Sequence, residues 1–186
     1  MTIGFALCGS FCTYNKIFPI IEILSRDFAI VPILSEAGAC IDSRFGSGIE
    51  HIQILTELCG RPPILGIPDA EPIGPKKMLD ALVIAPCTGN TLAKLSHGIA
   101  DGPVTMAAKS HLRNGRPVIL AVSTNDALGT AAENIGRLLA RKNVYFVPFG
   151  QDDPIGKPTS MVADFGKIPL ALEEALAGRQ VQPLIL

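Results

Sequence analysis

Charge is scarce in this chain, and neither sign is in excess. The 186 residues include 16 basic and 17 acidic ones, which give a formal net charge of −1. Nucleic acids and acidic membrane surfaces attract proteins with a basic excess, so neither is expected as a partner. Because only 18% of the residues are charged and 48% are hydrophobic, a monomer would expose apolar surface, and we expect a homo-oligomer.

Long hydrophobic runs and paired cysteines are also missing. No run reaches the roughly 20 apolar residues of a membrane span, and the apolar start of the chain lacks the basic flank of a signal peptide, so neither membrane insertion nor export is expected. The five cysteines are odd in number and show no C-x-x-C spacing, which argues against a disulfide framework and against a metal site. Free cysteines favour a cytoplasmic location.

Patterns of strand and helix alternate along the chain. Apolar runs predict strands at 2–7, 29–34, 81–85, 117–122 and 144–148, with a short edge strand at 64–67. Helical spacing and caps predict helices at 15–25, 47–59, 90–97, 103–113, 131–141 and 169–177. Right-handed crossovers place helices on both faces of a parallel sheet, so we expect one α/β domain over 1–186 with three layers, α/β/α.

The most informative stretch follows the run 81–85. This run is apolar without alternation, as in a central strand, and Pro86 is expected to end it because proline has no N–H to donate. The next five residues, 87–91, are small or hydrogen-bonding and open a helix near Asn90. Ligands in open α/β sheets bind beyond the carboxyl ends of strands, so this loop is a candidate site for an anion or a ring. Simple helix capping by Thr88 and Asn90 is the alternative.

Four strand ends carry hydroxyl or amide groups, namely Gly9-Ser10, Ser35, Thr88–Thr91 and Ser123–Asn125. Three of these turns contain no charged residue, which suits a neutral ring with a single phosphate tail. The G-x-G-x-x-G fingerprint of dinucleotide sites is absent, so we do not expect this chain alone to bind a nicotinamide cofactor.

Other chemically suggestive residues have an ordinary structural interpretation. Cys8 and Cys87 end two predicted strands and are expected to be small buried thiols. His51 lies on a predicted amphipathic helix, where a partly buried histidine is expected. The Pro/Gly-rich segment 148–158 predicts either a flap over a ligand or a solvated loop.

The motif after the central strand resembles that of a known family. Residues 84–95, followed by 98–101, are similar to the Pro-Ala-Ser-Ala-Asn-Thr motif of the flavin-dependent cysteine decarboxylase family, and Ser123–Asp126 lies where that family carries Pro-x-Met-Asn. The similarity covers about residues 3 to 150. It implies bound FMN on a mainly parallel, flavodoxin-like or Rossmann-like sheet, and assembly as trimers or multiples of trimers.

The resemblance also implies roles for individual residues. The cofactor-binding candidates are Gly9, Ser10, Ser35, Thr88, Asn90, Thr91 and Ser123. Among them the first three are expected to hold the FMN phosphate, whereas Thr88, Asn90 and Thr91, together with Asn125, are expected to face the ring and the substrate. Asn90 and Asn125 are the catalytic candidates.

Additional runs, including 113–118 and 148–154, resemble one branch of this family. Its members belong to a two-component oxidoreductase that makes a pyridine dicarboxylate in the mother cell of sporulating bacteria. The resemblance implies a partner protein that carries NADP, and Arg44 is the candidate ligand for a dicarboxylate substrate. The alternatives are a non-redox component that activates this partner, and a flavin-dependent decarboxylase. The latter is disfavoured because Pro72 stands at the position of the family's catalytic histidine.

Overall fold

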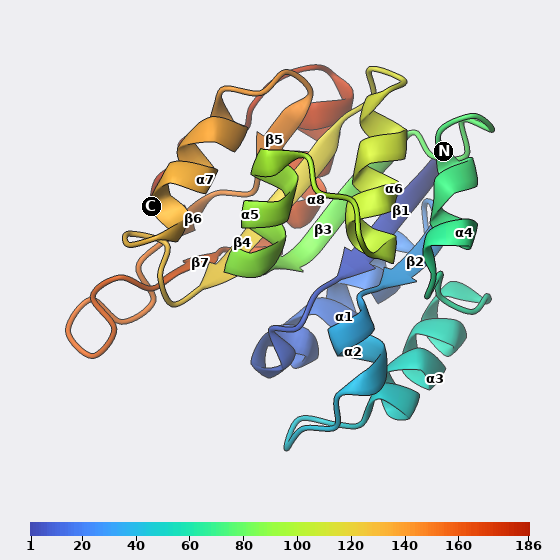
Figure 1. The fold of residues 1–186 in the computed structure, drawn as a ribbon, viewed down its shortest axis with the longest axis horizontal. Helices are drawn as coiled ribbons and strands as arrows, with labels where there is room; N and C mark the ends of the chain where they lie inside the picture. Colours follow the sequence, from blue (N-terminus) through green and yellow to red (C-terminus); the bar gives the residue numbers. More distant parts are fainter.

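The computed structural model describes residues 1–186 and is built around a seven-stranded sheet (Figure 1). Four parallel strands form its centre in the order β2, β1, β3, β4, and β5 pairs in parallel with the first part of β4. The short β7 pairs antiparallel with the end of β4, and β6 pairs with β7. The strand bounds are β1 Thr2–Leu7, β2 Ala29–Leu34, β3 Ala81–Cys87, β4 Val118–Thr124, β5 Val144–Phe146, β6 Phe149–Gly150 and β7 Met161–Ala163.

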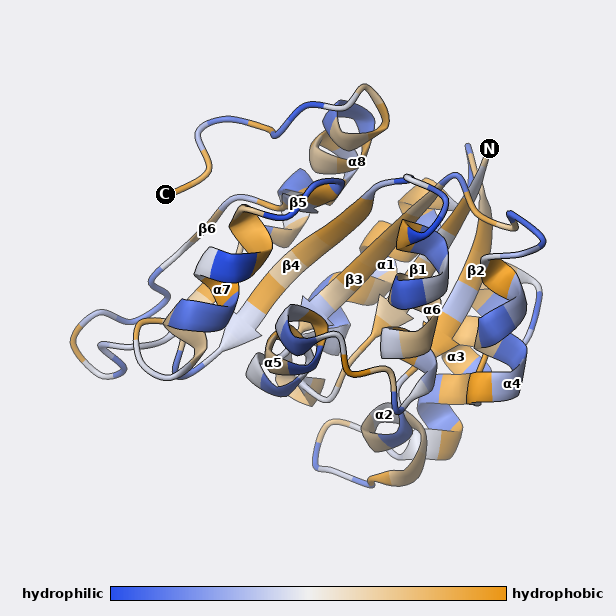
Figure 2. Cartoon of the chain, turned by 45° about the horizontal axis from the view of Figure 1, so that its top comes forward, coloured by the Kyte–Doolittle hydropathy of each residue, from blue (hydrophilic) through white to orange (hydrophobic).

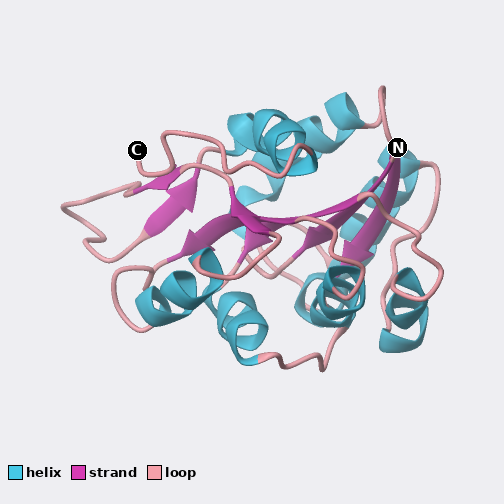
Figure 3. Ribbon diagram, turned by 90° about the horizontal axis from the view of Figure 1, so that it is seen from above, coloured by secondary structure: helices cyan, strands magenta, loops and turns pink.

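Helices cover both faces of the sheet (Figure 3). On one face α5 lies between α6 and α7 and contacts both, and α4 contacts α6. On the other face α1 contacts α8 and α3. The α-helix bounds are α1 Tyr14–Leu24, α2 Glu36–Cys40, α3 Gly48–Cys59, α4 Ile67–Ala70, α5 Gly89–His97, α6 Pro103–Leu112, α7 Ala131–Leu139 and α8 Ile168–Leu176. Single 3-10 turns occur at Phe11–Thr13, Glu71–Ile73 and Phe165–Lys167. The predicted three-layer α/β architecture is therefore confirmed.

The core lies between the sheet and these two helical layers. Every residue of β3 is buried, as its unbroken apolar run predicts, and Figure 2 shows the apolar strands at the centre of the molecule. No helix of the structure is both long and apolar enough to span a membrane.

Some predicted boundaries are wrong. Pro86 does not end the central strand, because β3 continues to Cys87. The pairing of β3 with β4 shifts in register between Ile84 and Cys87. Pro86, which has no N–H to donate, therefore lies where the regular hydrogen bonds between the two strands are interrupted. The expected edge strand at 64–67 is reduced to one bridge between Ile33 and Ile64.

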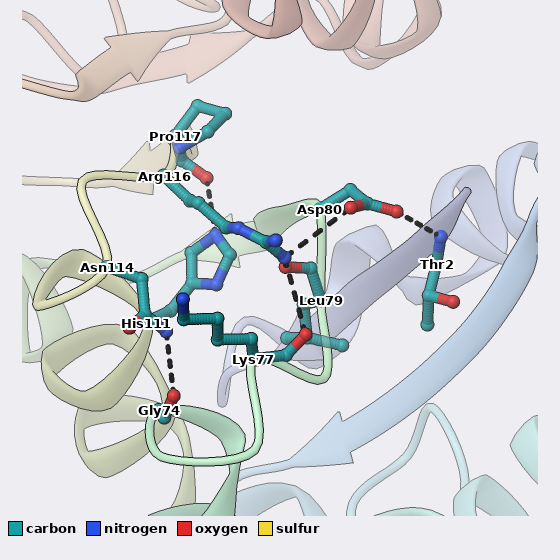
Figure 4. A network of polar contacts seen from close by, with 9 residues as sticks. All are labelled: Thr2, Gly74, Lys77, Leu79, Asp80, His111, Asn114, Arg116 and Pro117. Carbon is teal, nitrogen blue, oxygen red and sulfur yellow. Dashed lines mark hydrogen bonds and ion pairs between the residues drawn. The ribbon is translucent and has the colours of Figure 1, made fainter.

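A polar cluster joins the amino ends of the central strands (Figure 4). The Arg116 guanidinium donates to the carbonyl oxygen of Leu79 and lies 3.4 Å from Asp80 Oδ1, while Asp80 Oδ2 accepts the Thr2 N–H at 2.8 Å. Asn114 donates to the Gly74 carbonyl at 2.8 Å. This amino-edge cluster connects β1, β3 and β4 at the edge of the sheet opposite the loops that carry the predicted site.

Candidate functional site

The carboxyl ends of β1, β3 and β4 are tied together by their own side chains. Ser10 Oγ and Ser123 Oγ lie 2.9 Å apart and join the loops after β1 and β4. Thr91 Oγ1, in the first turn of α5, donates to Cys8 Sγ at 3.2 Å. The sequence predicted that these strand ends meet, and the structure brings them together at one edge.

A first cavity of about 380 Å³ opens beside these ends. It receives the amino ends of α2, α5 and α6, which begin after Ser35, Thr88 and Gly102. The first turn of a helix leaves N–H groups without intrahelical acceptors, so three partial positive charges face this space. The lining residues are Cys8, Gly9, Ser35, Glu36, Ala37, Thr88, Asn90, Thr91, Lys94, Asp101, Gly102, Pro103, Val104 and Thr105.

Charged side chains in the first cavity are few and partly neutralised. Lys94 Nζ lies 2.9 Å from Asp101 Oδ2, and this hydrogen bond holds the pKa of Asp101 below its ordinary value. Glu36 adds a second carboxylate. An anionic group in this cavity therefore has to lie toward Lys94 and the helix ends, away from Glu36.

A second cavity of about 550 Å³ adjoins the first and shares Gly9 and Thr88 with it. Its side chains come from the loops after β1, β3 and β4 and from the turn around Phe45, and they include two phenylalanines, one thiol and one carboxylate. The lining residues are Gly9, Ser10, Phe11, Cys12, Phe45, Thr88, Gly89, Ser123, Thr124, Asn125 and Asp126. Both volumes fall within the usual range for small-molecule sites.

The predicted site residues other than Arg44 line one or both cavities. Several of their hydroxyl groups already have protein partners, because Ser35 Oγ accepts the Gly38 N–H at 3.2 Å and Thr88 Oγ1 accepts the Thr91 N–H at 3.3 Å. Thr88 thus caps α5, whereas Asn90, which was expected to share this role, makes no capping bond. The side chains of Asn90 and Asn125 are exposed and make no hydrogen bond within the protein, so their amide groups are available to a ligand.

Arg44 lies at the rim of the second cavity. It is exposed on the turn formed by residues 43–46, and its guanidinium carbon lies 4.8 Å from the centre of the Phe45 ring. Phe45 lines the second cavity, whereas Arg44 lines neither. The arginine can therefore reach a ligand only where that ligand extends out of the cavity.

The two cysteines at strand ends are buried, as expected. Burial raises the pKa of Cys8 to about 11, and burial together with the neighbouring Cys8 raises the pKa of Cys87 well above its ordinary value. Both thiols are therefore protonated and unreactive at neutral pH. Cys12, by contrast, is exposed and lines the second cavity.

No histidine lines either cavity. His51 is 1% exposed, its Nδ1 lies 3.3 Å from the Gly38 carbonyl oxygen, and its Nε2 has no partner. Pro72, at the position of the decarboxylases' histidine, is in the 3-10 turn Glu71–Ile73 and lines neither cavity. The structure thus supplies no imidazole in the role that the decarboxylase alternative requires.

Sequence reasoning missed Phe11, Phe45 and Asp126. Phe11 and Asp126 follow strands whose ends were identified, so position after a strand was an available signal for them. Phe45 reaches the site from the turn beyond α2, and α2 itself was not predicted. No spacing in the sequence indicates that this turn folds back toward the ends of β1 and β4.

Comparisons with known proteins agree with this fold. A family model described as Flavoprotein matches residues 1–170. A dipicolinate synthase subunit of Bacillus subtilis (strain 168) is 48% identical over 185 residues, which are 99% of this chain and 92% of that protein. A crystal structure of the dipicolinate synthase subunit from Bacillus halodurans C has a TM-score of 0.91 at 44% identity and covers 100% of this chain and 95% of that one. A dodecameric FMN-dependent UbiX-like decarboxylase from Escherichia coli O157:H7 has a similar fold, with a TM-score of 0.66 at 22% identity over 80% of each chain.

Proposed function

Because the chain belongs to the Flavoprotein family, we propose that it is the FMN-binding component of a dipicolinate synthase. In this role it helps to oxidise a cyclic tetrahydrodipicolinate precursor to dipicolinate during sporulation. The observation that carries the proposal is the pair of adjoining cavities at the carboxyl edge of the sheet, joined through Gly9 and Thr88. A cofactor and a substrate bound in the two cavities would be in contact.

The donor set of the first cavity fits a phosphorylated cofactor. Gly9 and Ser35, which line this cavity, and Ser10, which lines the adjoining second cavity, would hold the FMN phosphate, supported by the helix amino ends and by Lys94. The carboxylates of Glu36 and Asp101 restrict where a phosphate can lie, but Asp101 is already paired. When bound, FMN would serve as an acceptor of two electrons.

The polar residues between the two cavities would hold the ring and the substrate. Thr88 and Thr91 border the first cavity, Ser123 borders the second, and the amides of Asn90 and Asn125 are unpaired. These amides would orient the substrate by hydrogen bonds, while Phe11 and Phe45 exclude water from one side of the ring. Arg44 at the rim would bind one carboxylate of the dicarboxylate substrate.

The proposal includes a second kind of polypeptide. The relative from Bacillus subtilis is one subunit of a dipicolinate synthase, and we propose that this chain works with the other dipicolinate synthase polypeptide, which carries NADP. The assembly would act in the cytoplasm of the mother cell. The chain would also form a homo-oligomer, a trimer or a multiple of trimers. The UbiX-like decarboxylase of similar fold is dodecameric, which supports this assembly.

The decisive measurement is the absorbance of the purified full-length protein after incubation with excess FMN and removal of unbound cofactor. We expect flavin bands at about one FMN per chain, because each chain has one such pair of adjoining cavities at the carboxyl ends of its strands. Gel filtration with and without the NADP-binding polypeptide tests the partner separately. A complex with that polypeptide in the absence of flavin bands would refute the flavin role and favour the non-redox activating component. Release of carbon dioxide from a peptide that ends in cysteine would favour the decarboxylase.

A further inference from the structure

The second cavity contains one carboxylate and no cationic side chain. Its titratable groups are Asp126 and Cys12, and Arg44 stands at its rim without lining it. Thr124 Oγ1 donates to Asp126 Oδ1 and fixes this carboxylate in the cavity. A dicarboxylate would bring two further negative charges, and buried charges are costly unless a charge of opposite sign pairs with them. Arg44 can pair with one carboxylate, so this chain leaves the other without a cation.

Exposed apolar side chains gather on the turn that borders this cavity. Phe45 lines the second cavity, and Ile41 and Ile49 lie four residues to either side of it in the sequence. All three side chains are exposed, and that of Ile49 is the most exposed at 69%. We call these three residues the rim patch. Apolar and aromatic side chains beside a ligand cavity are typical of a surface that a second polypeptide covers.

The backbone that carries the rim patch is held in place. Asp42 Oδ1 accepts the Gly48 N–H at 3.1 Å, which ties the two ends of the turn together. Gly48 packs so closely against α2 that a Cβ on it would come within 2.0 Å of the Ala39 carbonyl oxygen. Ile41 and Ile49 therefore leave from segments that touch each other. A partner would not have to order this turn, which lowers the cost of binding.

The charges around the rim patch are mostly negative. Residues 41–50 contain Asp42 and Glu50 but one cation, Arg44, and the cavity adds Asp126. The Ser47 N–H and hydroxyl group donate to Glu50 Oε2 at 2.6 and 3.0 Å, and they hold the pKa of Glu50 below its ordinary value. These carboxylates, together with the two of the substrate, match a partner surface that is apolar and carries cationic side chains.

On the basis of the proposed function, we propose that the NADP-carrying polypeptide docks on the rim patch, closes the second cavity and supplies the missing cation. A nicotinamide exchanges a hydride only with a ring that it touches, so this polypeptide has to cover the mouth of a cavity. Both carboxylates of a 2,6-dicarboxylate flank the ring nitrogen. Both can therefore face the mouth, one toward Arg44 and the other toward the cation of the docked polypeptide, while the uncharged side of the ring faces Asp126.

The affinity for pyridine-2,6-dicarboxylate tests the shared site without turnover. Titration calorimetry measures it for the full-length chain in the presence of FMN, for the NADP-carrying polypeptide, and for their complex. We expect the complex to bind the dicarboxylate roughly 10- to 100-fold more tightly than either polypeptide alone, the usual contribution of one hydrogen bond to a charged group. Equal affinity for the complex and for either polypeptide alone would overturn the shared site.

Substitutions of Ile49 test the docking surface and its charge. Ile49 lines neither cavity, so Ile49→Lys and Ile49→Asp should keep the flavin bands of the unmodified chain. Both variants lose apolar contact, but a lysine also repels a cationic partner. We therefore expect Ile49→Lys to raise the dissociation constant of the complex roughly tenfold or more, and Ile49→Asp to raise it less. Leu170→Lys is the matched control and should leave it unchanged, because Leu170 is exposed on α8 in a separate apolar groove of about 740 Å³.

Several outcomes overturn the inference. They include an unchanged complex in Ile49→Lys, and a complex that Ile49→Asp weakens more than Ile49→Lys does. Weakening by Leu170→Lys alone would place the polypeptide in the α8 groove. A homo-oligomer that dissociates in Ile49→Lys while the complex persists would assign the rim patch to a second copy of this chain.

The same measurements separate this inference from the proposed function. Flavin bands and a complex that is insensitive to both Ile49 substitutions would remove the rim patch alone. A complex that depends on Ile49 in the absence of flavin bands would support the rim patch and refute the flavin role. Absence of any complex between the two polypeptides would refute both the partner and the rim patch.

Discussion

At the scale of single residues, the hydroxyl groups of the site serve two purposes. Ser10 and Ser123 bond to each other across 113 positions of sequence and so hold the ends of β1 and β4 together. A hydroxyl group has one donor and two acceptor positions, so one such bond leaves each serine able to bind a ligand as well. Ser123 is 7% exposed, which makes its partner important for the fold.

We predict an energetic coupling between these two serines. Ser10→Ala removes one hydrogen bond of the Ser123 hydroxyl, so it should destabilise the protein by about 0.5–1.5 kcal/mol. Ser123→Ala in the same background should cost less than it costs alone. A double-mutant cycle by urea unfolding should give a coupling energy of about 0.5–1.5 kcal/mol. Strictly additive effects would show that the contact carries no stability, and Ser25→Ala, just after the end of α1, is the control.

At the scale of elements, the strands that could be predicted are those buried on both faces. The five parallel strands are apolar runs in the sequence, because each lies between two layers of helices. The two-residue β6 and the three-residue β7 are too short to show a hydrophobic periodicity in the sequence. They form only because β7 pairs with β4 and β6 pairs with β7. The same limit applies to the five-residue α2, which was missed.

The candidate site divides in a similar way. Its backbone framework could be predicted, because topology alone brings the carboxyl ends of parallel strands to one edge. Which side chains face the ligand could not be predicted, because this depends on local turns. Asn125 and Asp126 are neighbours, and only the structure shows that Thr124 orients the Asp126 carboxylate against Gly89.

The segment after β6 was expected to be either a flap or a solvated loop. Residues 151–159 line neither of the two cavities, and Ile155 at its tip is 96% exposed. The end of the segment nevertheless connects to the site, since Thr159 Oγ1 donates to the Asn125 carbonyl at 2.7 Å. In this structure it is an exposed loop whose base supports the loop that follows β4.

The last turn of α6 makes stability depend on pH. His111 is fully buried, and its Nε2 lies 3.1 Å from the Pro117 carbonyl oxygen, while its Nδ1 has no partner. Burial lowers the pKa of His111 from 6.5 to about 4. The unfolded chain therefore binds a proton at a higher pH than the folded one, so stability is fully present above pH 6.5 and falls as the pH decreases toward 4.

We predict that His111→Gln removes this part of the pH dependence. Between about pH 7 and about pH 4 the free energy of unfolding of the unmodified protein should fall by up to about 3 kcal/mol through this histidine. The glutamine variant starts less stable but should show a shallower decrease, measured by urea unfolding at a series of pH values. His97→Gln, at an exposed histidine, should retain the slope of the unmodified protein. Equal slopes for His111→Gln and the unmodified protein would contradict the assignment.

At the scale of the whole molecule, the two edges of the sheet have different chemistry. The carboxyl edge carries both cavities and the unpaired amides, whereas the amino edge carries the cluster of Arg116 and Asp80. The seven-residue strands β3 and β4 separate the two edges, and their residues are almost all buried. A change at the amino edge should therefore alter stability without reaching the ligand.

Arg116→Met tests this separation, because it keeps much of the aliphatic stem and removes the guanidinium. The Leu79 carbonyl and Asp80 would lose a charged donor, which should lower the free energy of unfolding by about 1–3 kcal/mol. Arg26→Met removes an exposed ion pair with Glu22 at 3.6 Å and should change stability by less than about 0.5 kcal/mol. In both variants the affinity for FMN and for pyridine-2,6-dicarboxylate, measured at a temperature where the protein is fully folded, should equal that of the unmodified chain. A loss of affinity in Arg116→Met alone would show that the two edges are coupled through β3 and β4.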